Sequence, residues 1–137
     1  MDLYVSTFPN SGVNGSQKDD KGNVVHAEFS IDGYRMYAMD SEGPHEFDFN
    51  NGASMMVLTN DQAETDAYWT SLLSDGGKEM QCGWLEDRFG VRWQIAPKAV
   101  IAMVGDNANP EKQQRAIAAM MKQIKLEIAP IAAAYNG

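Results

Sequence analysis

Among the residues of this chain that could act as a base, a nucleophile or a metal ligand, four are singled out as candidates: Glu28, Cys82, His26 and His45. Glu28 lies on the polar face of an alternating segment, where its carboxylate serves as a pocket base or is simply solvated. A nucleophilic cysteine needs a cation, an imidazole or a helix start to stabilise its thiolate, and sequence places none beside Cys82. A half-buried apolar role is therefore the simpler interpretation of Cys82. The two histidines are isolated in sequence, which is more typical of surface or hydrogen-bonded residues than of ligands.

The segments that must position these residues alternate in the first half of the chain between apolar and polar positions. Residues 23–31 carry one apolar face and predict a strand; that face consists of Val25, Ala27, Phe29 and Ile31. Asp32-Gly33 is a strong hairpin dipeptide, so residues 34–39 are expected to return as the partner strand. The end of a helix over residues 1–8 and a strand over 13–18 are expected before them.

The second half predicts a strand, a helix and three further strands. The strand over 53–58 leads to Asn60 or Asp61, either of which can cap a helix. This helix is expected to bury a stripe of apolar residues, namely Ala67, Tyr68, Leu72 and Leu73. Short strands are then expected at 78–81 and 82–86, a further strand at 91–96, and helices at 97–104, 109–124 and 126–135.

The two halves resemble each other in residue spacing, which indicates an internal duplication. Gly33-Tyr34-Arg35-Met36-Tyr37 matches Gly90-Val91-Arg92-Trp93-Gln94, and an Asp-to-Gly spacing of ten recurs from Asp2 and from Asp66. The predicted organisation is a single α+β domain: module one over 1–45, module two over 53–96 and a helical segment over 97–137. Module two has a strand before its helix, whereas module one has none. An alternative start, a boundary of the expressed chain or another chain covering the exposed edge would each account for that gap.

Composition narrows the classes of partner. The net charge of −8 argues against nucleic acid, because affinity for phosphate comes mainly from clustered Lys and Arg. The longest apolar run, over 99–104, is too short to span a bilayer. The single cysteine and the lack of a charged-then-apolar leader favour a cytoplasmic location.

Several segments resemble the PhnB-like branch of the vicinal oxygen chelate superfamily, which is often labelled demethylubiquinone methyltransferase-like. The resemblance rests on Phe8-Pro9-Asn10-Ser11, Ala27-Glu28-Phe29, Asp32-Gly33, Gly43-Pro44-His45, residues 81–95 and residues 131–137. It implies paired βαβββ modules, a cupped mixed sheet that forms a pocket, and a homodimer. No glycine pair follows a buried parallel strand, so a bound S-adenosylmethionine is not expected.

The same resemblance implies where a metal would bind in active members of the superfamily. The corresponding positions here are Gln94, Tyr37 and Ser54, which make a poor set for a divalent ion. We therefore expect no metal and no cofactor. Two hypotheses follow: a metal-free homodimer that binds a small organic molecule, or a divalent-metal dioxygenase, lyase or isomerase.

The expected pocket is lined by Tyr37, Ser54, Trp84, Arg92 and Gln94. Because side chains alternate along a strand, Arg92 and Gln94 are expected on the concave face and Trp93 beneath the helices. Trp69, Trp84 and Trp93 could line an apolar pocket, although aromatic residues at such positions usually lie in the core. A cation and an amide in the pocket suit an anionic or carbonyl-bearing ligand.

Overall fold

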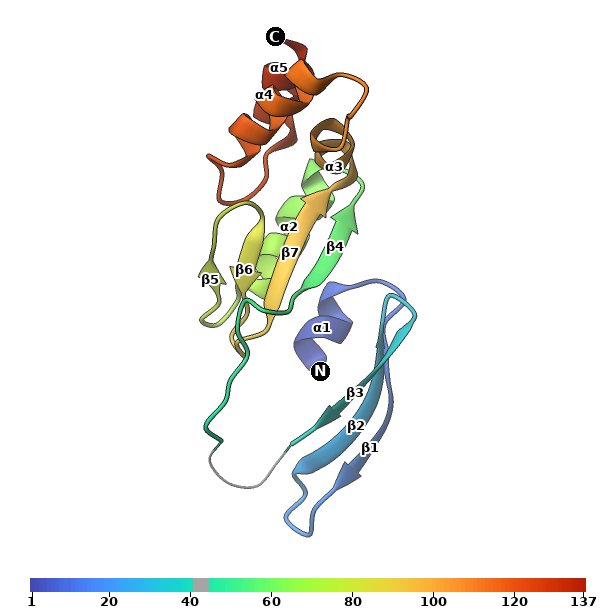
Figure 1. Ribbon diagram of the computed structural model, residues 1–137. Coiled ribbons are helices and arrows are strands. Elements are labelled where there is room, and N and C mark those ends of the chain that lie inside the picture. Colours follow the sequence, from blue (N-terminus) through green and yellow to red (C-terminus); the bar gives the residue numbers. More distant parts are fainter. Residues whose placement is uncertain (41–44) are drawn as a thin grey trace. The chain divides into compact units, whose positions relative to one another are not determined.

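The computed structural model describes residues 1–40 and 45–137, and these divide into two compact units, Met1–Asp48 and Phe49–Gly137. The chain is a mixed α+β protein with two sheets and helices at its C-terminal end, as the sequence predicts (Figure 1). The Gly43-Pro44 part of the motif quoted above lies outside the described residues. None of the described helices is long and apolar enough to cross a membrane.

The first unit is one helix packed on a three-stranded antiparallel sheet of order β1-β2-β3. Its elements are α1 (Asp2–Thr7), β1 (Gly12–Lys18), β2 (Val24–Ile31) and β3 (Tyr34–Met39). Asp32 and Gly33 both have positive φ, at 46° and 78°, which is the backbone of the tight hairpin turn that their sequence predicts. Tyr4 of α1 stacks on Phe29 of β2 with ring centroids 6.4 Å apart.

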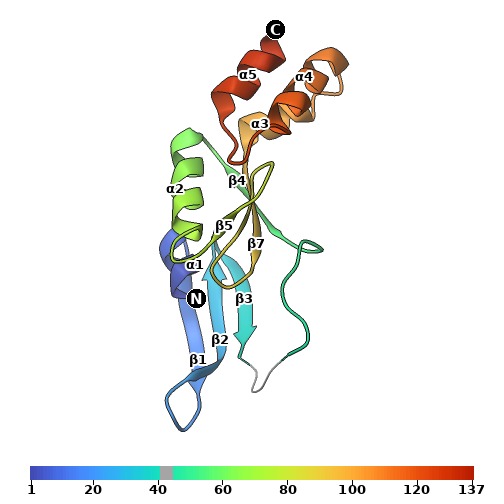
Figure 2. The same cartoon turned by 90° about the vertical axis from the view of Figure 1, so that its left-hand side faces the viewer.

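The second unit contains the complete βαβββ order in a four-stranded sheet, β4-β7-β6-β5. Its elements are β4 (Met55–Thr59), α2 (Gln62–Leu72), β5 (Lys78–Glu79), β6 (Trp84–Glu86), β7 (Arg92–Pro97), α3 (Lys98–Val104), α4 (Pro110–Met120) and α5 (Ile128–Asn136). The four strands lie side by side in Figure 1, and α2 lies along one face of this sheet in Figure 2. β4 pairs with β7 in parallel, and the other pairs are antiparallel.

The predicted buried stripe of α2 is confirmed at Leu72, is only half-buried at Tyr68 and Leu73, and is wrong at Ala67. Thr65, Trp69 and Leu72 are the buried residues of the helix, whereas Ala67 is exposed. Trp69 turns inward and donates from Nε1 to Glu79 Oε1 at 3.0 Å, while the half-buried Tyr68 donates its hydroxyl to Glu64. The cap prediction is confirmed for Asp61, whose side chain accepts from the Glu64 amide.

The segment between α4 and α5 ends α4 earlier than predicted, at Met120 rather than near residue 124. The carbonyls of Gln123 and Ile124 accept from the amides of Cys82 and Gly83 at 2.8 and 2.7 Å, so the chain leaves the helix to reach these donors. A small apolar core then joins the three C-terminal helices, made by Val100, Ala116, Leu126 and Ile131.

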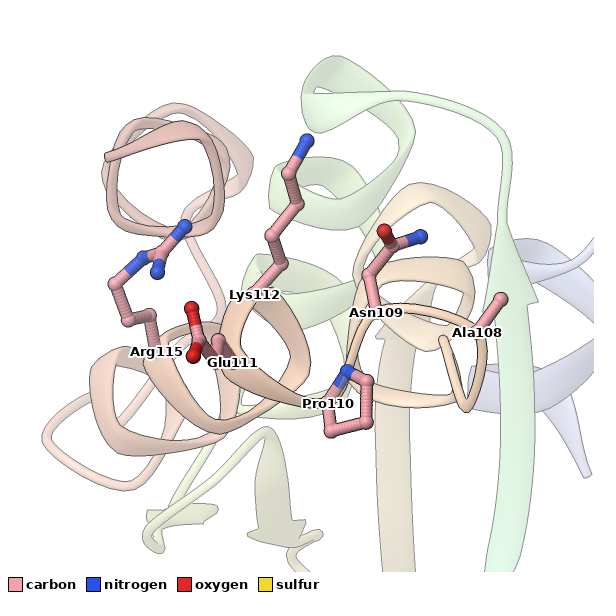
Figure 3. A pocket seen from close by; sticks show the side chains of 6 residues that line it. All are labelled: Ala108, Asn109, Pro110, Glu111, Lys112 and Arg115. Atoms are coloured by element: carbon pink, nitrogen blue, oxygen red, sulfur yellow. The ribbon is translucent and has the colours of Figure 1, made fainter.

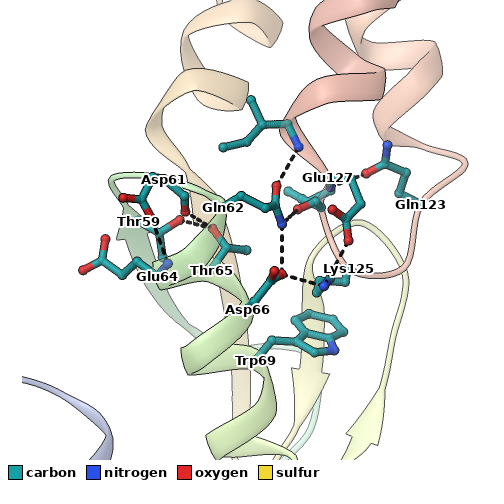
Figure 4. A network of polar contacts seen from close by, with 12 residues as sticks. Thr59, Asp61, Gln62, Glu64, Thr65, Asp66, Trp69, Gln123, Lys125 and Glu127 are labelled. Carbon is teal, nitrogen blue, oxygen red and sulfur yellow. Dashed lines mark hydrogen bonds and ion pairs between the residues drawn. The ribbon is translucent and has the colours of Figure 1, made fainter.

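A polar network ties this segment to α2 (Figure 4). Gln62 bridges it on both sides, because its amide donates to the Leu126 carbonyl at 3.2 Å and its carbonyl accepts from the Ile128 amide at 2.9 Å. Lys125 pairs with Asp66 at 2.5 Å and with Glu127 at 3.0 Å. The hydrogen bonds from Lys125, and then Gln62, lower the pKa of Asp66, and Asp66, followed by Glu127, raises the pKa of Lys125. The network therefore holds the segment before α5 on α2, within the second unit.

Candidate functional site

The strand β7 divides its side chains between two faces of its sheet. Trp93 is 1% exposed and lies on the face that α2 covers, together with Ile95. Arg92 and Gln94 alternate with them and lie on the opposite face, which we call the open face. The sequence predicts Trp93 on the face beneath the helices and Arg92 and Gln94 on the opposite face, and β7 shows this arrangement.

The turn before β7 depends on a buried carboxylate that sequence reasoning missed. Asp87 accepts from the amides of Phe89 and Val91 and from Trp93 Nε1, the last at 2.9 Å. The sequence signal was an acidic residue three positions before Gly90, where a short side chain often organises a turn. By fixing both the turn and the Trp93 ring, Asp87 fixes which side of β7 carries Arg92 and Gln94.

Three of the predicted pocket residues come together on the open face of the second unit. Gln94 donates from its amide nitrogen to Ser54 Oγ at 2.7 Å, across forty residues of sequence. Trp84 of β6 is directly opposite Gln94 in the register, and Met56 of β4 is opposite it on the other side. Trp84, Gln94 and Met56 thus form one row of an indole, an amide and a thioether, and the Ser54 hydroxyl joins this row through its bond to Gln94.

Arg92 lies beside this row and is held by three groups. Its Nε donates to Asn51 Oδ1 at 2.7 Å, and its Nη1 donates to the Gly90 carbonyl at 2.5 Å and pairs with Glu86 Oε2 at 2.7 Å. Sequence reasoning missed Asn51 and Glu86, although Glu86 is the cross-strand neighbour of Arg92 that a hairpin would place there. The guanidinium is therefore positioned, and its charge is balanced by one carboxylate.

The other predicted pocket residue, Tyr37, belongs to the first unit. There it lies opposite Glu28 in the β2–β3 register, and its ring is 6.1 Å from that of His26. Arg35 pairs with Glu28 at 3.1 Å; the hydrogen bond with Tyr37, and then the Glu28 charge, raise the pKa of Arg35. Glu28 is thus an ion-paired residue of a small polar group, and Arg35 is the member that the sequence did not single out.

Cys82 lies in a turn rather than at the start of a strand, so its predicted setting was wrong. Its φ of 60° and the φ of 80° at Gly83 break the extended backbone, and β6 begins only at Trp84. The Cys82 sulfur lies 3.6 Å from the Met121 sulfur. A thioether is neither a cation nor a base, so this contact supplies nothing that a nucleophilic cysteine requires. His45 packs on Phe47, with ring centroids 4.9 Å apart.

The superfamily resemblance assigns three positions of this chain to metal binding, and the side chains at all three are neutral. Ser54 offers a hydroxyl, Gln94 an amide and Tyr37 a phenol. Within residues 1–40 and 45–137, no three His, Cys, Asp or Glu side chains gather closely enough to hold an ion. Zinc prefers histidine, thiolate or carboxylate, and hard cations prefer several carboxylates, so these residues do not fit a metal.

A pocket of about 530 Å³ lies at the start of α4, and none of the predicted site residues lines it (Figure 3). It is lined by Ala108, Asn109, Pro110, Glu111, Lys112 and Arg115. Its two cations are engaged by α5: Arg115 donates to the carbonyls of Ala134 and Tyr135, and Lys112 lies over the Tyr135 ring. These contacts fasten α4 to α5.

With this geometry in hand, comparison with known proteins places the chain in a family. Residues 1–96 match the family described as 3-demethylubiquinone-9 3-methyltransferase. The chain belongs to that family. The match covers both modules and stops at the start of the C-terminal helices. No curated protein matches the chain.

Two solved structures are similar to this member of the 3-demethylubiquinone-9 3-methyltransferase family. A PhnB protein from Bacillus cereus is 28% identical, with a TM-score of 0.67, over 71% of this chain and 87% of that one. The crystal structure of protein PA1353 from Pseudomonas aeruginosa is 18% identical, with a TM-score of 0.54, over 70% of this chain and 84% of that one. The first supports the PhnB-like relationship, and the second supports the fold alone.

Proposed function

We propose that this chain binds a small organic molecule with a carbonyl or an anionic group, without a resident metal ion, as a homodimer of the vicinal oxygen chelate type. The observation that carries the proposal is the row on the open face of the second unit. There, the Ser54–Gln94 hydrogen bond lies next to Trp84 and close to a positioned Arg92.

The hydrogen bonding within the row leaves groups for a ligand. Gln94 uses its amide nitrogen on Ser54, so the Gln94 carbonyl can accept and the Ser54 hydroxyl proton can be donated. Trp84 adds a half-buried indole beside them, which suits the apolar body of a small molecule. An anionic ligand group competes with Glu86 for Arg92, so moderate affinity is expected for anions and a carbonyl is the better fit.

Metal-dependent catalysis is the alternative that the superfamily resemblance brings. The neutral donors at Ser54, Gln94 and Tyr37 support binding over that alternative. Methyl transfer, which the family description names, finds little support in the connection from β4 to α2. That connection is Asn60-Asp61, without the glycines that open the backbone to a nucleotide-like cofactor, and Asp61 caps the helix itself.

A cytoplasmic location and the exclusion of nucleic acid and membrane partners belong to the same proposal. The net charge of −8 supports the exclusion of nucleic acid and membrane partners, since a phosphate-rich surface repels such a chain.

The test is a thermal-shift screen of small carbonyl compounds and carboxylic acids, followed by calorimetry on any compound that raises the unfolding temperature. Gln94→Ala and Arg92→Ala are each expected to weaken binding roughly tenfold, about the contribution of one charge-assisted or well-placed hydrogen bond. Arg88→Ala is the matched control, because Arg88 pairs with Asp75 outside the row. A ligand whose affinity is the same in all three variants contradicts the proposed site.

A further inference from the structure

Three asparagines of this chain precede a glycine, namely Asn14, Asn51 and Asn136. In such a pair the glycine amide nitrogen can attack the asparagine side-chain carbonyl, because glycine has no Cβ to block the approach. The attack releases ammonia and closes a succinimide ring, which water then opens to aspartate or isoaspartate. At each pair a neutral amide can thus become a carboxylate without an enzyme, and the local backbone decides whether the attack occurs.

Two of these pairs are restrained by regular secondary structure. Asn14 lies in β1, and the ladder that β1 forms with β2 includes Gly15. Asn136 is the last residue of α5, where the Gly137 amide donates to the Ala133 carbonyl at 3.2 Å. Because a hydrogen-bonded strand or helix fixes the backbone dihedrals, neither glycine nitrogen reaches the side-chain carbonyl without local opening.

The third pair, Asn51-Gly52, lies in an exposed turn before β4. The Gly52 amide donates to the side-chain Oδ1 of Asn50 at 2.8 Å, and Asn50 is itself exposed. An exposed side chain changes rotamer within nanoseconds or less, so this acceptor releases the glycine nitrogen readily. The backbone at Asn51 is therefore the least restrained of the three against ring closure.

The carbonyl under attack at Asn51 also carries a cation. Arg92 Nε donates to Asn51 Oδ1 at 2.7 Å. As the glycine nitrogen attacks, this oxygen becomes the oxyanion of a tetrahedral intermediate, and a charged donor at this distance stabilises it. Arg92 is held in place by the Gly90 carbonyl and by Glu86, so the donor is positioned before the reaction begins.

We propose that Asn51 is a site of spontaneous deamidation that Arg92 accelerates. A bond forms between the Gly52 nitrogen and Asn51 Cγ, and the bond from Cγ to the side-chain nitrogen breaks. The proton of the Gly52 amide passes to a base in the solvent, and the side-chain nitrogen leaves as ammonia. Hydrolysis of the succinimide consumes one water, so the sum of the steps is one water taken up, one ammonia released and one carboxylate formed beside Arg92.

The consequence of this modification falls on the open face, and this part of the inference rests on the proposed function. Arg92 is paired with one carboxylate, that of Glu86, and deamidation gives it a second. An anionic ligand then competes with two carboxylates for the guanidinium. A neutral carbonyl compound is spared this competition, because the Ser54 hydroxyl proton remains available to it. Deamidation therefore shifts the preference of the site from anions towards neutral carbonyl compounds.

The first test follows all three pairs in one sample by peptide mapping and mass spectrometry, in the folded chain and in the chain unfolded by guanidinium chloride. Folding is expected to slow deamidation at Asn14 and Asn136 roughly tenfold or more, because both require local opening. At Asn51, folding is expected to speed it roughly threefold or more, because only the folded chain places Arg92 on the carbonyl. Folding that slows Asn51 as it slows the other two overturns the proposal.

Two variants separate the roles of the nucleophile and the cation. Gly52→Ala is expected to slow deamidation roughly tenfold, since its Cβ obstructs the attacking nitrogen; that Cβ would meet only the end of the Asn50 side chain, at 2.9 Å. Arg92→Met keeps an unbranched stem without a donor and is expected to remove the acceleration, whereas Arg88→Ala is expected to leave it unchanged. Slow deamidation at Asn14 and Asn136 verifies that each variant is folded. Faster deamidation at Asn51 in Arg92→Met would show that Arg92 merely restrains the turn, and would overturn its proposed role.

Calorimetry with benzoate and with acetophenone, a neutral carbonyl compound, tests the consequence for binding. Asn51→Asp reproduces the added charge and is expected to weaken benzoate binding roughly fivefold, as for a partly screened charge, and to leave acetophenone binding unchanged. Asn14→Asp adds the same charge in the other unit and is the matched control. Equal benzoate affinity in both variants overturns the shift in preference. Failure of freshly prepared wild type to bind either probe contradicts the proposed function and the shift with it, while the deamidation rates decide the modification independently.

Discussion

The strand after the hairpin turn has the same residue spacing in both units, yet its surroundings differ. β3 carries Arg35 and Tyr37 on its open face and β7 carries Arg92 and Gln94, and each arginine pairs with a glutamate of the preceding strand. The Arg92 pair is largely buried, while the Arg35 side chain is mostly exposed. The duplicated motif therefore supplies the same chemistry twice, and the covering elements decide how strongly it is held.

Those covering elements belong to the second unit. β4 lies beside β7, and the segment between α4 and α5 lies on the turn between β5 and β6. The corresponding turn of the first unit, between β1 and β2, has open space around Gly22. The position of a residue in the repeated motif thus predicts whether it lies on the open face. Contacts from outside the motif determine how deeply that residue is buried.

The largest expected difference in unfolding free energy is between substitutions at Trp93 of β7 and at Met36, the equivalent residue of β3. Trp93→Ala removes a fully buried ring that also donates to Asp87, and is expected to cost about 3–5 kcal/mol of unfolding free energy. Met36→Ala, at the equivalent half-buried position, is expected to cost about 1 kcal/mol. Urea unfolding of both variants measures the contrast, and equal losses would show that the strands are covered alike.

The next effect concerns the two equivalent turns. A Cβ at Gly83 would come within 2.8 Å of the Ile95 carbonyl oxygen and 2.9 Å of Leu126 Cδ1, at a φ of +80°. Gly83→Ala is therefore expected to cost roughly 2–3 kcal/mol, from strain and from displacement of the C-terminal segment. Gly22→Ala is the matched control: its φ is +87° but nothing lies nearby, so about 1 kcal/mol is expected. A smaller loss at Gly83 than at Gly22 would refute the covering role of that segment.

The ion pairs Arg92–Glu86 and Arg35–Glu28 allow the stability contributed on the two open faces to be compared directly. Glu86→Gln leaves the largely buried Arg92 without its counter-charge and is expected to cost about 1–2 kcal/mol. Glu28→Gln breaks an exposed pair and is expected to change stability by less than about 0.5 kcal/mol. Denaturant titrations of the two variants, run at the same ionic strength, decide the order; a larger loss at Glu28 contradicts it.

The smallest expected effect is the pH dependence of the contact between α2 and the C-terminal segment. Because the folded-state pKa of Asp66 is lowered, chiefly by Lys125, its ionised form stabilises the fold above its ordinary pKa, and this is lost as pH falls through the lowered value. The pKa of Lys125 is raised, so its contribution persists through neutral pH and is lost only in strong base.

Asp66→Asn is therefore expected to cost a few tenths of a kcal/mol, up to about 1 kcal/mol, at pH 7, as for other exposed pairs. The difference from wild type is expected to shrink as pH falls below the ordinary carboxyl pKa and to vanish below the lowered pKa of Asp66, where the carboxylate is protonated in both states. Asp20→Asn, at an exposed turn position, is the control for the general effect of removing a negative charge. A deficit of Asp66→Asn that grows as pH falls would contradict this account of the contact.

Local patterns predicted most of the elements and the face assignments of β7. Alternation gave β2 and β3, Asp32-Gly33 gave their turn, and strand parity gave the opposite sides of Gln94 and Trp93. Asp61 was among the two capping residues predicted for α2. These features depend on a residue and its near neighbours in sequence, which is why the sequence suffices for them.

Features that depend on distant contacts were missed. The buried stripe of α2 was predicted without Trp69, which turns inward to reach Glu79. Cys82 was placed on a strand because the carbonyls of residues 123 and 124 were not foreseen. The meeting of Ser54 with Gln94 could be expected from the family resemblance, and Asp87 was signalled only by its place three positions before Gly90, whereas the role of Asn51 had no such signal. Long-range hydrogen bonds of this kind leave little trace in local periodicity.

Elemental analysis of protein purified without chelator tests the central claim most directly. The neutral donors Ser54, Gln94 and Tyr37 predict no stoichiometric zinc, iron, manganese or nickel, and the same background in wild type and Gln94→Ala. About one metal ion per chain in wild type, lost in Gln94→Ala while Arg88→Ala retains it, would contradict metal-free binding and favour a metal-dependent enzyme.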